Sequence, residues 1–145
     1  MNDYALIGKN ILIIDKYFKI YFKNALKIYG LNASEGLALL MLYEGKCQTQ
    51  DQIISELHYD KGVIARTMKE LEDKGYVERN ENPVDNRSFI FNVTEKSELV
   101  RPHIIRILKS WSDKLMDGID DIEVLKMAIT KMSINAYNTV KGDNE

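Results

Sequence analysis

The sequence predicts a mainly α-helical fold with one small β-hairpin. Two observations support this fold class. Over residues 4–73 and 98–137, apolar residues recur at intervals of three and four positions, which is the spacing of one face of a helix. Between residues 76 and 93, aromatic and β-branched residues instead alternate on either side of a polar loop, which is typical of two paired strands. We expect one domain over residues 1–145.

Composition indicates a soluble globular chain. The 145 residues match the usual size of one domain, and 45% hydrophobic with 29% charged residues is an ordinary globular balance. No apolar run approaches the roughly 20 residues of a membrane span. Residues 1–3 lack the basic start of a secretory signal. We therefore expect a cytoplasmic protein.

Several kinds of chemistry have little support in the sequence. The single cysteine, Cys47, has no partner for an internal disulfide, and His58 and His103 alone leave a zinc site short of ligands. The eight glycines are scattered rather than gathered in a phosphate-binding loop, and neither a nucleophile with its base nor a paired-carboxylate site is evident. We expect neither an enzyme nor a cofactor. The net charge of −2 gives no general attraction for nucleic acid, so any such binding has to come from local geometry.

The first predicted helix covers residues 4–29 and ends at Gly30. One apolar stripe runs along it, and five lysines lie on its other face, which makes this segment the most basic part of the chain. The stripe consists of Ile7, Ile11, Ile14, Phe18, Tyr21, Phe22 and Ala25.

Two capping signals begin the next two helices. Asn32 followed by Glu35 three positions later predicts a capping box, in which each residue satisfies a backbone amide of the other. The leucine-rich helix that follows is apolar nearly all round, so we expect it to be buried. Thr49 and Gln52 repeat the signal for a short third helix that ends near Leu57.

The fourth predicted helix covers residues 60–75, with Asp60 as N-cap and Gly75 as its end. A stripe of Ile64, Met68 and Leu71 would face the core, and Lys61, Ala65, Arg66 and Lys69 would lie on another face. An ordinary amphipathic helix shows the same pattern. Only two residues separate this helix from the third, however, which is the short turn of a helix-turn-helix unit.

Strands are predicted at residues 76–79 and 89–93, joined by the polar loop 80–88. A helix-turn-helix followed by such a hairpin makes a winged helix. A long helix follows from about residue 98, with Pro102 tolerated near its start. Gly118 interrupts the pattern, and Asp120 or Asp121 then caps a last helix that reaches about Tyr137.

The first and last helices carry more apolar surface than the winged helix between them, a head of about sixty residues, can cover. A second subunit is therefore expected to bury it. The residues concerned are Ile7, Ile11, Ile14, Ile122, Ile129 and Met132.

Residues 31–97 resemble the winged helix-turn-helix of the multiple antibiotic resistance regulator (MarR) family, and the flanking helices extend the likeness over nearly the whole chain. The resemblance rests on several motifs in the right order and spacing. These are the Leu-Asn-Ala-Ser-Glu start of the second helix at 31–35, the segment 49–57, Arg66, the run Leu-Glu-Asp-Lys-Gly-Tyr-Val-Glu-Arg at 71–79, Asp-Asn-Arg at 85–87 and Val-Thr-Glu-Lys at 93–96.

The resemblance implies a homodimer that binds a pseudo-palindromic operator in double-stranded DNA, with one recognition helix per subunit in the major groove and the wing near the minor groove. In this family residues 31–97 would form the DNA-binding lobe, and 1–30 with 98–145 the dimerisation region. The usual scheme is a repressor released by a small molecule. The residues implied for DNA are Thr49, Gln50, Lys61, Gly62, Val63, Ala65, Arg66, Lys69, Asp85 and Arg87.

Each of these residues has an expected role. Arg66 is the best candidate for base reading, since a guanidinium can donate two hydrogen bonds to one guanine edge. Lys61 and Lys69, with Thr49 and Gln50 at a helix N-terminus, suit phosphate contacts. Arg87 would enter the minor groove, oriented by an ion pair with Asp85. Outside DNA, Arg87 would make only a weak surface salt bridge.

Three features set this sequence apart from the family pattern. Gly62 and Ala65 replace residues that often carry hydroxyl or amide groups, so direct base contacts would be few. Asn86 replaces a frequent arginine of the wing. Residues 58–91 carry six basic and seven acidic side chains, a net charge of −1. We therefore expect modest DNA affinity with a shallow dependence on salt.

The family also has a cleft for aromatic or phenolic effectors. Residues that could line it here are Tyr17, Phe18, Tyr21, Met41, His103, Ile107 and Trp111, although aromatic residues at helical spacing more often belong to a core. Two other functions stay open. The nearly neutral head would also suit a winged-helix protein-interaction module, and Cys47 could serve a thiol-based redox sensor.

Overall fold

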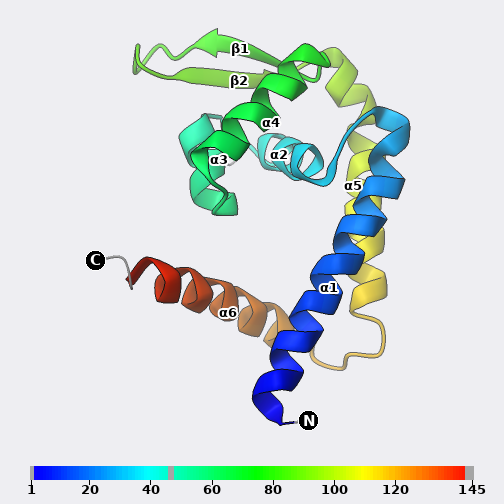
Figure 1. The fold of residues 1–145 in the computed structure, drawn as a ribbon. Coiled ribbons are helices and arrows are strands. Elements are labelled where there is room, and N and C mark those ends of the chain that lie inside the picture. Colours follow the sequence, from blue (N-terminus) through cyan, green and yellow to red (C-terminus); the bar gives the residue numbers. More distant parts are fainter. Residues whose placement is uncertain (1, 46–47, 143–145) are drawn as a thin grey trace. The chain divides into compact units, whose positions relative to one another are not determined.

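The computed structural model describes residues 2–45 and 48–142 (Figure 1). The chain forms two compact units, residues 1–111 and 112–145. Cys47, the candidate redox thiol, lies outside the described residues. The first unit holds the helices and the hairpin that the sequence assigned to the head, and the second unit holds the last helix.

Helices and one two-stranded sheet make up the described chain, which confirms the predicted fold class. The first helix, α1, is followed by a single 3-10 turn, η1. The elements in order are α1 (Asp3–Leu26), η1 (Lys27–Tyr29), α2 (Ala33–Tyr43), α3 (Gln50–Leu57), α4 (Lys61–Asp73), β1 (Val77–Glu81), β2 (Phe89–Val93), α5 (Glu95–Leu115) and α6 (Ile122–Gly142).

Both capping boxes form as predicted. The Asn32 side chain accepts from the Glu35 amide at 2.9 Å while the Glu35 carboxylate accepts from the Asn32 amide at 2.9 Å. Thr49 and Gln52 repeat this exchange at the start of α3. Asp60 is the N-cap residue of α4, but its side chain makes no capping hydrogen bond, contrary to expectation. Asp60 is exposed, so water can satisfy the first amides of α4 instead.

Some element boundaries differ from those predicted. β1 extends to Glu81, because all five of its residues pair antiparallel with β2, from Val77 opposite Val93 to Glu81 opposite Phe89. The last helix extends beyond Tyr137 to Gly142. Its N-terminus is capped by Asp121, whose carboxylate accepts from the Val124 amide at 3.0 Å.

The core of the first unit is made where α1 to α5 and the hairpin meet. The predicted stripe of α4 is buried, with Ile64 and Leu71 fully inaccessible and Met68 nearly so. It packs with buried residues of the other elements, so the opposite face of α4 is left to solvent. The least exposed of these buried residues include Phe22, Leu26, Leu39, Ile53 and Ile104.

A buried ion pair joins the start of α2 to the end of α4. Glu35 is completely inaccessible to solvent, and its two carboxylate oxygens lie 2.7 and 2.9 Å from the ammonium nitrogen of Lys74. One of those oxygens also accepts from the Asn32 amide. Because Lys74 is the C-cap residue of α4, the capping box of one helix fixes the end of another.

Three further hydrogen bonds surround this pair, each to a backbone carbonyl. The Tyr76 hydroxyl donates to Tyr29 at the end of η1, at 2.6 Å. Lys96 donates to Lys74, and the Thr94 hydroxyl donates to the Gly75 carbonyl, both at 2.6 Å. Burial raises the pKa of Tyr76, which keeps its hydroxyl protonated as a donor. We call Glu35, Lys74 and these bonded groups the junction.

Replacing Lys74 with alanine should destabilise the fold, because it leaves the buried Glu35 carboxylate without its countercharge. We expect a loss of about 2 to 3 kcal/mol in the free energy of unfolding, below the full cost of breaking a buried pair because Lys74 is partly exposed. Urea denaturation measures this loss.

Lys19→Ala is the matched control, because Lys19 pairs with Asp15 at 2.6 Å on the exposed surface of α1. We expect the control to lose less than about 1 kcal/mol. Equal losses in the two variants would show that the buried pair does not hold the junction together.

Candidate nucleic-acid interface

The helix-turn-helix presents the predicted face of α4 to solvent. His58 takes the left-handed conformation that turns the chain between α3 and α4, with φ of 52°. The predicted reading residues Lys61, Gly62, Ala65, Arg66 and Lys69 are all exposed. Val63 alone is half-buried, so it contributes less to that face than the sequence suggested.

The cations of α4 differ in their availability. Lys69 lies 2.7 Å from Asp73 and 3.8 Å from Glu72, and the hydrogen bond to Asp73 raises the pKa of Lys69. Its charge is therefore offset by two acidic neighbours on the same helix. By contrast, no residue in the described part of the chain pairs with Lys61 or Arg66. Arg66 is the cation most available to a partner at the centre of α4.

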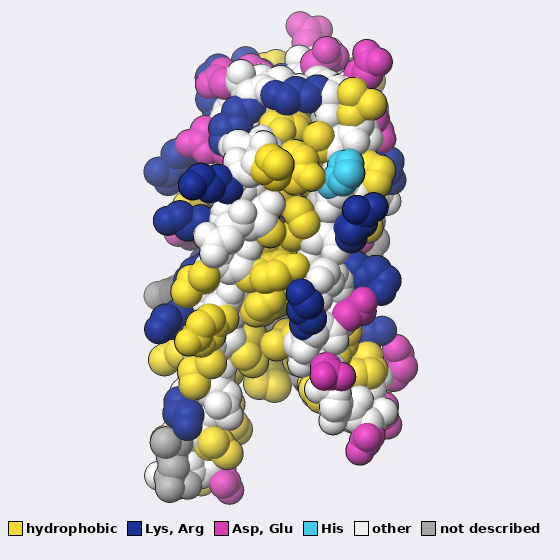
Figure 2. Space-filling model, turned by 90° about the vertical axis from the view of Figure 1, so that its right-hand side faces the viewer, with side chains coloured by type: hydrophobic (Ala, Val, Ile, Leu, Met, Phe, Trp, Pro, Cys, Tyr) yellow, Lys and Arg dark blue, Asp and Glu magenta, His cyan; other side chains and the backbone are white. Residues whose placement is uncertain are grey.

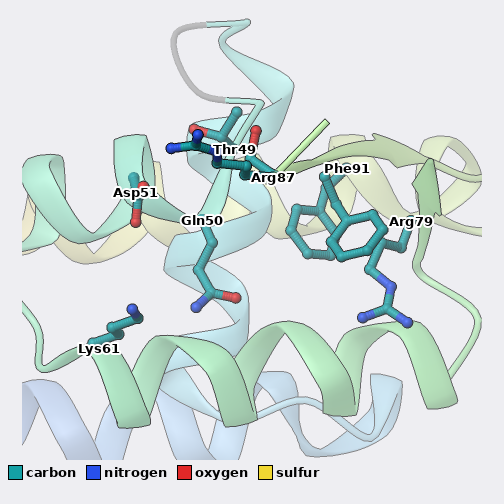
Figure 3. A pocket seen from close by; sticks show the side chains of 9 residues that line it. Thr49, Gln50, Asp51, Lys61, Arg79, Arg87 and Phe91 are labelled. Carbon is teal, nitrogen blue, oxygen red and sulfur yellow. The ribbon is translucent and has the colours of Figure 1, made fainter. Parts of the chain in front are cut away.

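A hollow of about 230 Å³ lies beside this face, between the helix-turn-helix and the hairpin (Figure 3). Figure 3 shows Gln50 and Arg79 both extending toward α4, and Arg87 near Thr49. The hollow thus gathers cations from α4, β1 and the wing. Its lining residues are Thr49, Gln50, Asp51, Lys61, Arg79, Arg87, Ser88, Phe89 and Phe91.

Arg79 is a candidate functional residue that the sequence reasoning missed. Its guanidinium carbon lies 4.5 Å from the centre of the Phe89 ring, and its Nε lies 3.5 Å from Glu72 of α4. The strand register could have revealed it, because Arg79 is opposite Phe91 and so diagonal to Phe89. These contacts hold a cation at the edge of the hollow.

The expected ion pair between Asp85 and Arg87 is not formed. The Asp85 carboxylate instead accepts from the backbone amide of Arg87 at 3.0 Å, and the Asp85 carbonyl accepts from the Ser88 amide at 3.2 Å. A carboxylate can bond an amide two residues ahead without ordering a long side chain, which explains this preference. Asp85 therefore shapes the wing, and the exposed Arg87 guanidinium pairs with no described residue.

The residues expected around an effector fall into two groups. Phe18 and Tyr21 of α1 pack on Trp111 of α5, with ring centres 5.8 and 5.2 Å apart, and the Tyr21 hydroxyl donates to the Ile107 carbonyl at 3.4 Å. These four residues come together, with the rings of Phe18 and Tyr21 both in contact with the Trp111 ring.

The other three residues have different surroundings. Tyr17 is 54% exposed, Met41 is buried in the core, and His103 stacks on Tyr29 at 6.1 Å. Within the described residues, no cluster of histidine, cysteine or acidic side chains could hold a metal ion. None of the described helices is long and apolar enough to cross a membrane.

Comparisons with known proteins agree with this geometry. Residues 31–89 match the model of the MarR family. The HTH-type transcriptional regulator BilQ of Clostridioides difficile (strain CD3) is 33% identical over 124 residues, which is 83% of this chain and 82% of BilQ. The HTH-type transcriptional regulator MgrA of Staphylococcus aureus is 26% identical, covering 85% of this chain and 83% of MgrA.

A solved structure gives the same result. The MarR transcriptional regulator from Methanosarcina mazei Go1 is 29% identical and superposes with a TM-score of 0.77, covering 94% of this chain and 98% of that one. The winged helix-turn-helix, the exposed cations of α4 and the wing, and these relatives lead to one conclusion. The chain belongs to the MarR family of transcriptional regulators, which bind DNA and are not enzymes.

Proposed function

We propose that this chain is a homodimeric repressor that binds a pseudo-palindromic operator in double-stranded DNA and leaves it when a small aromatic or phenolic effector binds. The observation that carries the DNA part is Arg66, an exposed arginine without an ion-pair partner in the described chain, at the centre of the outer face of α4. The rings of Phe18, Tyr21 and Trp111 are where a planar effector could exchange ring contacts.

Two solved structures with the same fold contain DNA. They are the reduced AbfR bound to DNA and a mutant MarR from E. coli complexed with operator DNA, each 19% identical to this chain, with TM-scores of 0.75 and 0.74. We extend the DNA partner to this chain as part of the proposal. The exposed face of α4 and the neighbouring hollow support it.

Within this proposal, Arg66 reads a guanine edge through two hydrogen bonds. Gly62 and Ala65 put no long side chain at two positions of the exposed face of α4, so the helix can approach the bases closely there. Sequence preference then depends on Arg66 and on the shape of the groove. Val63, half-buried, adds little contact area.

Phosphate contacts come from the rim of the same face. Lys61 borders the hollow with Thr49 and Gln50 at the start of α3, which suits a phosphate placed between α3 and the hairpin. Arg79 lies at the same edge, but its contact with Glu72 competes with phosphate. Lys69 contributes less than the sequence suggested, because binding phosphate competes with its pair to Asp73. Arg87 reaches the minor groove from the wing, whose shape is held by the hydrogen bond between the Arg87 backbone amide and the Asp85 carboxylate.

Exposed apolar side chains on the outer helices support the dimer. In α1, Ile7 is 54% and Ile11 49% exposed, and Figure 2 shows hydrophobic side chains gathered on the face that carries α1 and α5. In α6, Ile129 is 53% exposed, and no described residue of that helix is buried. We assign residues 1–30 and 98–145 to dimerisation, because contiguous apolar surface of this kind marks an interface.

Replacing Ile129 with aspartate should break the dimer, because it places a charge inside an apolar interface. We expect sedimentation equilibrium to give the mass of one chain for this variant at concentrations where the unmodified protein is dimeric. Asn138→Asp is the matched control on the exposed surface of α6 and should stay dimeric. A fully dimeric Ile129→Asp protein would place the interface elsewhere.

Replacing Arg66 with alanine should weaken operator binding by about 1 to 3 kcal/mol and relax preference at one base position, since it removes a two-bond contact to a base edge. Fluorescence anisotropy with the DNA upstream of the chain's own gene measures the affinity. Arg106→Ala, an exposed arginine of α5, should leave it unchanged. If the Arg66→Ala variant bound the operator as tightly as the unmodified protein, α4 would not be the helix that reads the bases.

A further inference from the structure

A second hollow, of about 340 Å³, lies next to the junction and away from the proposed DNA-binding face. It is formed by the end of α1, the turn into α2 and the end of α4, all within the first unit. Its volume is at the lower end of the range of small-molecule sites. The lining residues are Lys23, Asn24, Lys27, Gly30, Leu31, Asn32 and Lys74.

Three lysines from two separate segments of the chain converge on this hollow, and none of its lining residues is acidic. Lys23 and Lys27 lie one turn apart at the end of α1, and neither pairs with an acidic group in the described ranges. Only Lys74 has a countercharge, the buried Glu35. Three positive charges against one leave the hollow with a net charge of +2, which favours an anion.

The ammonium group of Lys74 can bond Glu35 at the junction and still donate a hydrogen bond to a ligand in the hollow. An ammonium group has three N–H donors, and the two contacts to Glu35 at 2.7 and 2.9 Å account for two of them. The Lys74 side chain is 37% exposed, although its partner Glu35 is fully buried. Asn32 uses its side-chain oxygen to cap α2, so its side-chain NH₂ is still available as a donor.

A lysine face in water is usually no more than a solvated surface. Here three lysines instead line a concave space, and the ammonium group of Lys74 is fixed by a buried carboxylate. Charge-assisted hydrogen bonds from fixed donors are the stronger kind. The arrangement thus differs from that of the lysines nearer the N-terminus of α1, of which Lys19 is paired with Asp15 and Lys16 lies near the Tyr17 ring.

We propose that this hollow binds a small anion of multiple charge, a phosphate-bearing or polycarboxylate compound, through Lys23, Lys27 and Lys74. A ligand there would draw on the same ammonium group that ties Glu35 to the end of α4. Occupancy thereby acts on the position of α4, and this regulatory part rests on the proposed function in DNA binding. The binding site itself does not depend on that function.

Isothermal titration calorimetry of the full chain, without DNA, tests the site. Inorganic phosphate and citrate are titrated separately, which distinguishes a compact phosphate from a polycarboxylate. We expect at least one of them to saturate with a Kd of about 1 mM or tighter. The double variant Lys23→Gln, Lys27→Gln should bind at least about tenfold more weakly, because it loses two charge-assisted contacts.

The double variant Lys9→Gln, Lys16→Gln is the matched control, since it removes the same charge from α1 outside the hollow. It should bind like the unmodified protein. Saturable binding lost only in the first double variant supports the site. Failure of both anions to saturate, or equal weakening in both double variants, overturns it. Because no DNA is present, neither result bears on operator binding, which the Arg66→Ala experiment tests separately.

Discussion

The ion pair between Glu35 and Lys74 is the interaction on which the position of α4 depends. A carboxylate that is wholly inaccessible to solvent is costly unless it is paired and hydrogen-bonded, and here Lys74 and the Asn32 amide satisfy it. The same contact ties the beginning of α2 to the end of α4. Nearby, Tyr76 bonds the carbonyl of Tyr29, so the end of η1 meets the same place. The position of the exposed face of α4 therefore depends on the contact between Glu35 and Lys74, which lies outside that face.

Charge pairing also decides which cations of α4 and the hairpin are available to bind DNA. Lys69 and Arg79 are both tied to acidic side chains of α4, which reduces their net attraction for phosphate. Lys61, Arg66 and Arg87 are the cations of the described α4 and hairpin that are left without such a partner and that border the proposed DNA surface. A head with a net charge near zero can therefore still present a few well-placed cations. Its binding would depend on geometry more than on bulk attraction.

Local patterns in the sequence were enough to predict the fold. Both capping boxes, the buried stripe of α4 and the alternating strand after the loop are set by residues within a few positions of each other. The pair between Glu35 and Lys74 joins residues 39 positions apart, and no spacing rule connects them. At the wing, one carboxylate had two possible donors, and Asp85 took the backbone amide rather than the Arg87 side chain. The pairing of Lys69 with an acidic residue four positions later follows helical spacing, so the sequence alone could have predicted it.

The salt dependence of operator binding tests most directly whether paired charges limit this regulator. Each of the three available cations places one positive charge against the DNA and displaces about one counterion there, whether it contacts a phosphate or lies in a groove. A dimer brings six such charges, so log K should fall with log salt concentration with a slope of about −5. Measurement at several salt concentrations on one operator gives that slope. A value of about −9 or steeper would mean that the paired cations also reach phosphate, and it would contradict the account. A slope near −3 would fit one subunit and would contradict binding as a dimer.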